Sequence, residues 1–199
     1  MFTGIIQDIG QTVSFSNGEL EISTKLDLSD CLIGSSICCN GVCLTAKAIN
    51  FRDGKYYFKV DVGEETQSRT NFSQNLFSKL LNINIEKSLK IGDEISGHFV
   101  YGHVDRVTEI TNINKLDNSW EFYFKNFQDK DRKFIVEKAS IAINGVSLTI
   151  AKVDKKNFSI SIIPHTFHKT NLNQLKIGDF VNVEFDYLSR FFIKERLDE

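Results

Sequence analysis

The sequence predicts a mainly β protein built from two copies of one small antiparallel barrel, followed by a C-terminal helix. Aromatic residues make up 12% of the chain and include 17 Phe, a composition that suits pleated, half-buried strands better than a helical bundle. The chain also repeats itself in the same order, at a period of about 100 residues. Its 199 residues leave room for two domains of about 100 residues each.

The repeat is clearest in one nine-residue segment. Residues 37–45 read ICCNGVCLT, and residues 141–149 read IAINGVSLT. Two shorter matches follow in the same order: RTN at 69–71 with KTN at 169–171, and INIE at 83–86 with VNVE at 181–184. We therefore predict one domain over residues 1–96 and another over residues 97–187. Because no Pro- or Ser-rich linker separates them, we expect a short, tight connection near Gly97.

Local patterns predict the elements of each copy. An Asn-Gly dipeptide between apolar residues is the strongest short-range signal for a two-residue hairpin, and each copy has one. Turn residues at 50–54 and 154–157 separate short strands at barrel spacing. In the tail, Leu188, Phe191 and Phe192 share one side of a helix. We expect a helix over residues 188–199, packed on its own subunit or, as we favour, on a neighbouring one.

Charge and cysteine content limit the function classes. The net charge is -2 and no basic block is present, which argues against nucleic acid or an anionic membrane as partner and favours a small molecule. The N-terminal residues show neither a leader nor a spanning segment, so we expect a cytoplasmic protein. The His pairs 98/103 and 165/168 have odd spacings that point to opposite faces of a strand, so we expect no metal site.

All four cysteines fall within residues 31–43, and we interpret them as reduced thiols. In a two-residue hairpin Cys38 lies opposite Cys43, so we hypothesise that oxidants impair the protein. The Cys43 thiol itself has two equally supported interpretations, a ligand contact or nucleophile and a small buried hydrophobe.

Alternation along the strand places polar side chains on one face of each repeated segment. Cys43 and Thr45 share a face opposite Leu44, and Ser147 and Thr149 share one opposite Leu148. Three differences between the copies mark functional candidates: Cys43 against Ser147, Gly4 against His103, and Glu65 against His165.

Two of these candidates have chemical alternatives. Histidine side chains in general change charge near neutral pH, so His103 suits a proton shuttle, or else a structural hydrogen bond. Ser147 and Thr149 suit hydrogen bonding to a ligand, or are ordinary strand hydroxyls. A serine without an adjacent base is a poor nucleophile, so we expect Ser147→Ala to slow turnover without abolishing it. His98, His165 and His168 offer no comparable argument for a role as a base.

Five motifs taken together are specific: MFTGI at 1–5, NGVCLT at 40–45, GH at 97–98 with GHVD at 102–105, NGVSLT at 144–149, and IPHT at 163–166. They resemble the riboflavin synthase family over essentially the whole chain. The resemblance implies two six-stranded antiparallel barrels, each with a lumazine site, and no cofactor. It also implies a homotrimer held partly by the C-terminal helices, with the active site between subunits, and an association with lumazine synthase.

The resemblance also implies the site residues. It places catalytic roles at Phe2, Cys43, His103, Ser147 and Asp186. It places substrate contacts at Gly4, Ile5, Ile6, Cys43, Leu44, Thr45, Asp61, Val62, Gly63, Glu64, Glu65, Thr66, Gly102, His103, Val104, Lys138, Ser147, Leu148, Thr149, Ser161, Ile162, Ile163, Pro164, His165 and Thr166. Solvation would equally explain Lys138, and capping of the C-terminal helix would explain Asp186.

The chain departs from the family pattern in three places. Asn144 stands where Asp is usual, Ser96 where a second Gly is usual, and Gln67-Ser68 where Leu-Arg is usual. An amide cannot accept a proton at neutral pH, so Asn144 cannot replace a catalytic carboxylate. Asn is also the better hairpin residue, and a turn role alone would explain it.

The activity implied is the conversion of two molecules of 6,7-dimethyl-8-ribityllumazine into riboflavin and 5-amino-6-(D-ribitylamino)uracil. The main alternative is a binding protein of the same fold, an antenna that holds a lumazine or flavin without turning it over. A flavin-dependent oxidoreductase is more remote, because no Gly-x-Gly-x-x-Gly fingerprint is present.

Overall fold

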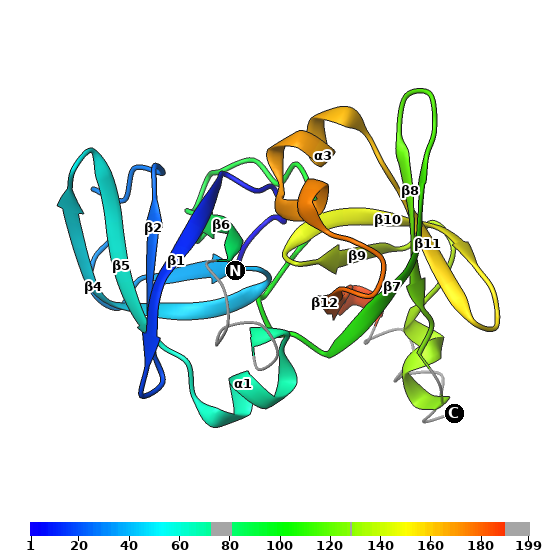
Figure 1. Ribbon diagram of the computed structural model, residues 1–199, viewed down its shortest axis with the longest axis horizontal. Coiled ribbons are helices and arrows are strands. Elements are labelled where there is room, and N and C mark those ends of the chain that lie inside the picture. Colours follow the sequence, from blue (N-terminus) through cyan, green and yellow to red (C-terminus); the bar gives the residue numbers. More distant parts are fainter. Residues whose placement is uncertain (73–80, 128, 190–199) are drawn as a thin grey trace.

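Two closed antiparallel barrels of six strands each form the molecule. Figure 1 shows them side by side. The computed structural model describes residues 1–72, 81–127 and 129–189. The first barrel contains β1 (Asp8–Ser16), β2 (Glu19–Thr24), β3 (Ser36–Cys39), β4 (Val42–Arg52), β5 (Lys55–Asp61) and β6 (Asn82–Lys87). The second contains β7 (Arg106–Lys115), β8 (Trp120–Lys125), β9 (Ser140–Ile143), β10 (Val146–Val153), β11 (Asn157–Ile162) and β12 (Phe180–Phe185).

The two barrels have the same topology. Around the first barrel the strands run β1-β2-β5-β4-β3-β6, and around the second the equivalent order is β7-β8-β11-β10-β9-β12. A six-residue helix follows β5 in one copy and β11 in the other: α1 (Glu64–Arg69) and α3 (Pro164–Lys169). Two 3-10 helices, η1 (Asp129–Phe134) and η2 (Asn171–Gln174), complete the second copy. The duplicated barrel fold predicted from the repeat is confirmed.

The Asn-Gly hairpins form as predicted, with positive φ at both central residues. The φ angles are 48° and 79° at Asn40 and Gly41, and 45° and 79° at Asn144 and Gly145, as a type I′ turn requires. The two hairpin tips also touch each other. A Cβ atom on Gly41 would lie 2.7 Å from the backbone nitrogen of Gly145, so each glycine allows the close approach of the other copy.

Each barrel has its own apolar core. Inward-facing residues such as Leu20 and Phe58 in the first barrel and Phe122 and Ile160 in the second are fully buried. Burial of a side chain of this size stabilises a fold by roughly 1.5–3 kcal/mol. In the described residues, closure of each sheet leaves no strand edge unpaired.

Buried asparagines join the two barrels. Asn84 Nδ2 donates to the Asn144 carbonyl at 3.0 Å, and Asn182 Nδ2 donates to the Asn40 carbonyl at 2.8 Å. The Asn144 side chain accepts from the Asn182 backbone N–H at 2.9 Å and is 1% exposed. Asn144 therefore serves the turn and this junction, which supports the turn interpretation of its departure from the family pattern.

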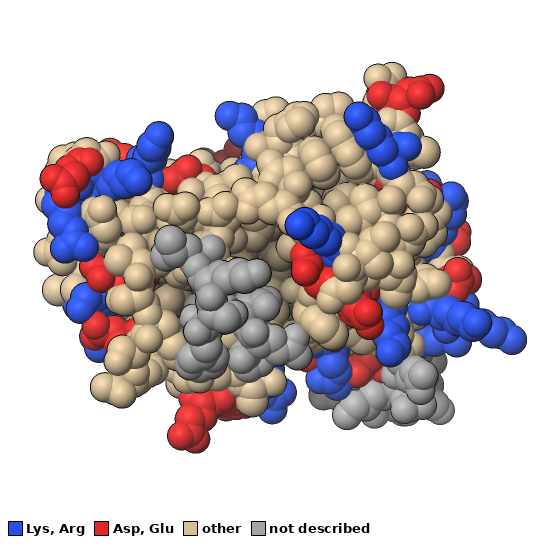
Figure 2. Space-filling model, in the orientation of Figure 1, with Lys and Arg blue, Asp and Glu red and all other residues tan. Residues whose placement is uncertain are grey.

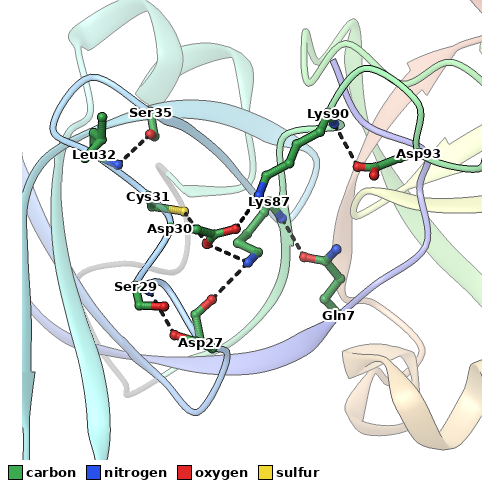
Figure 3. Close-up of polar contacts among 10 residues, drawn as sticks. All are labelled: Gln7, Asp27, Ser29, Asp30, Cys31, Leu32, Ser35, Lys87, Lys90 and Asp93. Carbon is green, nitrogen blue, oxygen red and sulfur yellow. Dashed lines mark hydrogen bonds and ion pairs between the residues drawn. The ribbon is translucent and has the colours of Figure 1, made fainter.

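The connection between the barrels is longer than we expected from the sequence. β6 ends at Lys87 and β7 begins at Arg106, and the predicted boundary at residues 96 and 97 falls inside this segment. Figure 3 shows how the start of this segment is held. The carboxylate of Asp30 forms ion pairs with Lys87 Nζ at 2.8 Å and with Lys90 Nζ at 2.6 Å. These two lysines hold the pKa of Asp30 well below its usual range. The prediction of a short connection was wrong because the segment crosses to the other barrel, as described below.

The C-terminal segment begins with a helical turn at residues 187–189. Asp186 caps it, since its Oδ1 atom accepts from the Leu188 N–H at 3.1 Å. Residues 190–199, and with them most of the predicted helix over 188–199, lie outside the described residues. In the described part of the chain, no helix has the length and apolarity needed to cross a bilayer. Acidic and basic side chains are mixed over the face shown in Figure 2.

Candidate functional site

Two extended segments cross each other between the barrels, and we name them the N-terminal strap (residues 1–6) and the linker strap (residues 98–104). Phe2 N donates to the Val100 carbonyl at 2.7 Å, and Val100 N donates to the Phe2 carbonyl at 3.0 Å. Figure 1 shows the N-terminus close to the place where the two barrels meet. Each strap leads into the first strand of its own barrel, β1 or β7.

Each strap nevertheless contacts the other barrel. The Gly4 carbonyl of the N-terminal strap accepts from Ser147 N on β10 at 2.8 Å, and the Gly102 carbonyl of the linker strap accepts from Cys43 N on β4 at 2.8 Å. The contacts are tight: a Cβ on Gly4 or Gly102 would lie 2.6 Å from the Cβ of Ser147 or Cys43. The predicted site strands and the predicted glycines thus come together crosswise, and each candidate site is built from both copies.

This arrangement corrects one pairing made from the sequence. Gly4 and Gly102 have φ angles of 76° and 77° and make the same contact, so they are equivalent. His103 therefore corresponds to Ile5 and not to Gly4. The asymmetry between the copies at this position is an imidazole against an aliphatic side chain, and both residues are exposed.

The polar faces of the site strands are as predicted from alternation. Cys43 and Ser147 are half-buried, Thr45 and Thr149 are exposed, and the intervening Leu44 and Leu148 are 4% and 9% exposed. The two leucines lie in the barrel cores, so only their backbone can face a ligand.

The loops that follow β5 and β11 show identical burial patterns over residues 61–66 and 161–166. Val62 and Ile162 are buried and anchor the loops. The other positions are exposed or half-buried: Asp61, Gly63, Glu64, Glu65 and Thr66 in the first copy, and Ser161, Ile163, Pro164, His165 and Thr166 in the second. The carbonyls of Thr66 and Thr166 accept from the hydroxyls of Thr70 and Thr170 at 2.7 and 2.8 Å, which fixes both short helices.

The second barrel carries a pair that sequence reasoning missed. His98 Nδ1 lies 2.7 Å from Ser147 Oγ, which supplies the adjacent base that we thought Ser147 lacked. Burial lowers the pKa of His98, and the nearby carboxylate of Asp186 opposes this change. The imidazole is therefore neutral at pH 7 and able to accept a proton. The Gly97-His98 dipeptide was visible in the sequence, but nothing in its spacing indicated contact with Ser147.

Gly97 permits this approach. A Cβ at position 97 would lie 2.0 Å from the Thr3 carbonyl oxygen and 3.0 Å from Ser147 Oγ. His98 N donates to the same Thr3 carbonyl at 3.1 Å. The crossing of the straps therefore delivers His98 to the serine of the second barrel.

The first barrel has different chemistry at the equivalent place. Cys43 replaces Ser147, and in the described part of the chain no histidine hydrogen-bonds to its thiol. Cys38 lies directly opposite Cys43 in the register of β3 and β4, as predicted, and both are free thiols. Ser88 takes the place of Asp186 after the last strand of the barrel. The two sites therefore have similar backbone geometry but different side chains that could transfer protons.

The remaining predicted residues occupy varied positions. Phe2 is fully buried against Cys38, Val100 and Ala142, so its side chain packs the strap crossing and cannot touch a ligand in this structure. Lys138 has a φ of 70° in the turn before β9. Ile6 packs against the second core, and Val104 packs against the first.

Comparison with known proteins gives the class of this molecule. Residues 3–87 and 101–186 each match the lumazine binding domain family. The fold is similar to that of LumP complexed with riboflavin, with a TM-score of 0.77, 25% identity, and coverage of 93% of this chain and 99% of that chain. The molecule is thus a tandem lumazine-binding-domain protein.

Curated relatives narrow the class. The chain is 36% identical to riboflavin synthase of Actinobacillus pleuropneumoniae over 100% of its length and 93% of the relative's. It is 37% identical to riboflavin synthase of Brucella abortus, with 96% of both chains covered. Riboflavin synthase of Bacillus subtilis is 36% identical, with 98% of this chain and 89% of that protein covered. The chain therefore belongs to the riboflavin synthase family.

Proposed function

We propose that this chain is an enzyme that converts two molecules of 6,7-dimethyl-8-ribityllumazine into one riboflavin and one 5-amino-6-(D-ribitylamino)uracil. The observation that carries the proposal is the Ser147–His98 pair at 2.7 Å, beside Asp186, in one of two otherwise equivalent ligand sites. Two identical substrates must play different parts in this reaction. Two barrels of the same topology supply two similar sites, and among the described residues the serine–histidine pair is found at only one of them, which makes the sites different.

The reaction is a transfer of four carbons between like molecules. The donor loses a proton from its C7 methyl group, and the acceptor is attacked at its own C7, so no redox cofactor enters the balance. With Nδ1 of His98 unprotonated, the Ser147 hydroxyl donates to it, and the pair can take up a proton from the donor or activate a nucleophile at the acceptor. Asp186 favours the imidazolium that forms.

Positioning contributes more than proton transfer. Fixed orientation of two reactants supplies about 7–11 kcal/mol, whereas a general acid or base gives about 10²- to 10⁴-fold in rate. The straps serve orientation directly, because each fixes backbone of one copy against the site strand of the other.

The test is incubation of purified protein with dimethylribityllumazine alone, followed by riboflavin fluorescence. Turnover supports the enzyme. The similarity to LumP favours the second candidate, a binding protein without turnover. Tight binding of the lumazine with no riboflavin formed would support that candidate and refute ours.

The proposal includes a homotrimer in which the site of one subunit faces the site of another. Its support is that the loops over 63–65 and 163–165, and Ile5 on the N-terminal strap, are exposed in the single chain. A single subunit leaves the two bound lumazines without the closure that a bimolecular reaction needs. Sedimentation velocity of the active protein tests this, with a trimer expected and an active monomer contradicting it.

Location and partnership complete the proposal. A cytoplasmic location is supported by the four free cysteines, and fractionation of cells tests it. Association with lumazine synthase, which would supply the substrate, rests on the family resemblance alone. Copurification of the two proteins tests it.

A further inference from the structure

Two buried glutamates hold the straps. Glu86 on β6 is 3% exposed and Glu184 on β12 is 5% exposed. They occupy equivalent positions in the repeat, and neither belongs to the Ser147–His98 pair. Burial of a carboxylate costs free energy unless its oxygens accept hydrogen bonds. The donors that bond to each glutamate therefore indicate its role.

All the donors come from the strap of the same barrel. Glu86 accepts from Thr3 N at 2.7 Å, Thr3 Oγ1 at 2.7 Å and Gly4 N at 3.0 Å. Glu184 accepts from Tyr101 N at 2.6 Å, Gly102 N at 2.8 Å and His103 N at 3.0 Å. Each carboxylate therefore fixes the backbone of one strap at the residue whose carbonyl reaches the other barrel.

These contacts form two chains of hydrogen bonds that cross between barrels. Glu184 of the second barrel holds Gly102, and Gly102 accepts from Cys43 of the first. Glu86 of the first barrel holds Gly4, and Gly4 accepts from Ser147 of the second. The path in each case runs from the last strand of one barrel to the site strand of the other.

We propose that Glu86 and Glu184 are positioning residues that act crosswise: Glu184 shapes the ligand site of the first barrel, and Glu86 shapes the ligand site of the second. The proposal deepens the proposed function, on which its role in turnover rests. It predicts that a change in one barrel weakens binding in the other, which no contact within a single barrel would produce.

Only an ionised carboxylate satisfies three donors. A protonated acid or a Gln amide presents an N–H or O–H to the strap, where donors already point. Burial raises the pKa of Glu184 to about 7 and raises the pKa of Glu86, so part of the Glu184 population loses its charge near neutral pH. Asp105 raises the Glu184 pKa further.

Other titratable side chains lie around Glu184. It lines a cavity of about 310 Å³ with Tyr101, His103, Asp105 and Tyr187. Burial raises the pKa of Cys38 on β3, and the nearby charges of both glutamates raise it further. His103 lines the same cavity, and a His103→Gln variant separates any effect of its imidazole from that of Glu184.

The experiment measures binding of ¹³C-labelled riboflavin to the full-length protein by NMR, with one bound signal for each barrel. Thr45→Val and Thr149→Val assign the signals, since each removes a hydroxyl from one site strand. We expect Glu184→Gln to weaken the first-barrel site at least tenfold and the second less than twofold, and Glu86→Gln to do the reverse. Glu109→Gln, on the outside of β7, is the matched control and leaves both signals unchanged.

Losses confined to the mutated barrel, equal losses at both sites, or no loss would each overturn the proposal. Where Glu184→Gln does not fold, Glu184→Asp keeps the charge on a shorter arm and is expected to show the same first-barrel loss to a smaller degree. The pH profile gives a readout that a purely structural role would not move: first-barrel affinity in the wild type and in His103→Gln rises from pH 6 to 8, and in Glu184→Gln it does not. Wild-type protein that binds riboflavin at both sites without turning over lumazine refutes the proposed function, while the crosswise pattern is still decided by the same signals.

Discussion

The imidazole of His98 and the hydroxyl of Ser147 lie 2.7 Å apart although their positions in the chain differ by 49. His98 reaches Ser147 because the linker strap passes the N-terminal strap, and because Gly97 lets the backbone of Thr3 come close. The imidazole–hydroxyl pair therefore lies at the site strand of the second barrel.

Loss of the imidazole should separate turnover from binding. We expect His98→Ala to lower kcat by about 10²- to 10⁴-fold, the range for a general base, with a much smaller change in lumazine affinity because the variant removes a proton-transfer group. Steady-state kinetics and equilibrium titration measure the two quantities.

Ser147→Ala should slow turnover without abolishing it, and the double variant His98→Ala/Ser147→Ala should be no slower than the worse single variant, since the two side chains act as one unit. Additive losses would show that they act separately. Complete inactivity of Ser147→Ala in a folded trimer would contradict this prediction, because it would show that the hydroxyl is indispensable for turnover.

Glu184 should make stability and site geometry respond to pH in opposite directions. Its pKa is about 7 in the folded protein against an ordinary 4.5, so the folded state disfavours the ionised form. Ionisation therefore removes stability progressively as pH rises from about 4.5 to about 7. We expect the Tm of the wild type, relative to Glu184→Gln, to fall over this interval. A relative Tm that rises with pH would mean that the hydrogen bonds from the strap outweigh burial.

Gly4 should tolerate no side chain, because φ is 76° and a Cβ would lie 2.6 Å from Ser147 Cβ. Gly4→Ala combines backbone strain of about 1–3 kcal/mol with displacement of the strap, so we expect lower stability and at least a tenfold loss of kcat. Gly34→Ala is the control: its φ of 94° gives similar strain, but nothing lies within 4 Å of the added Cβ. It should lose stability in urea denaturation while keeping its activity.

The asparagine junction should be unequal in its two halves. Asn171 Oδ1 accepts from Asn84 Nδ2 at 2.9 Å, whereas Asn71 Oδ1 has no hydrogen-bond partner in the described structure. Truncation of Asn171 leaves a buried donor unpaired, which costs about 1–3 kcal/mol. Asn171→Ala should therefore lower the free energy of unfolding more than Asn71→Ala does. Equal losses would show that the Asn84 amide finds another partner.

Much of the fold can be predicted from the sequence because the repeated motifs determine local structure. Asn40-Gly41 and Asn144-Gly145 fix hairpins by their own φ preferences, and alternation assigns faces to Cys43 and Ser147 once the strands are known. These features depend on residues that are near in sequence, so pattern reasoning reaches them.

The strap crossing could not be predicted in this way. Gly102 follows Gly4 by 98 positions, whereas Asn144 follows Asn40 by 104, so no single offset aligns both motifs. This difference produced the mistaken pairing of Gly4 with His103. The role of His98 depends on a tertiary contact, and no periodicity records such a contact. Glu86 and Glu184 are visible in the sequence as a repeated residue. Their proposed role, however, depends on their burial and on their hydrogen bonds to the straps, and the sequence shows neither.

The most direct test of the central claim, that two lumazines react with each other across unlike sites, is the stoichiometry of a complete time course with dimethylribityllumazine as the sole added compound. We predict that two lumazines disappear for every riboflavin and every ribitylaminouracil formed, and that His98→Ala binds the lumazine but makes both products slowly. Riboflavin formed without the matching pyrimidine, or a His98→Ala variant as fast as the wild type, would contradict it.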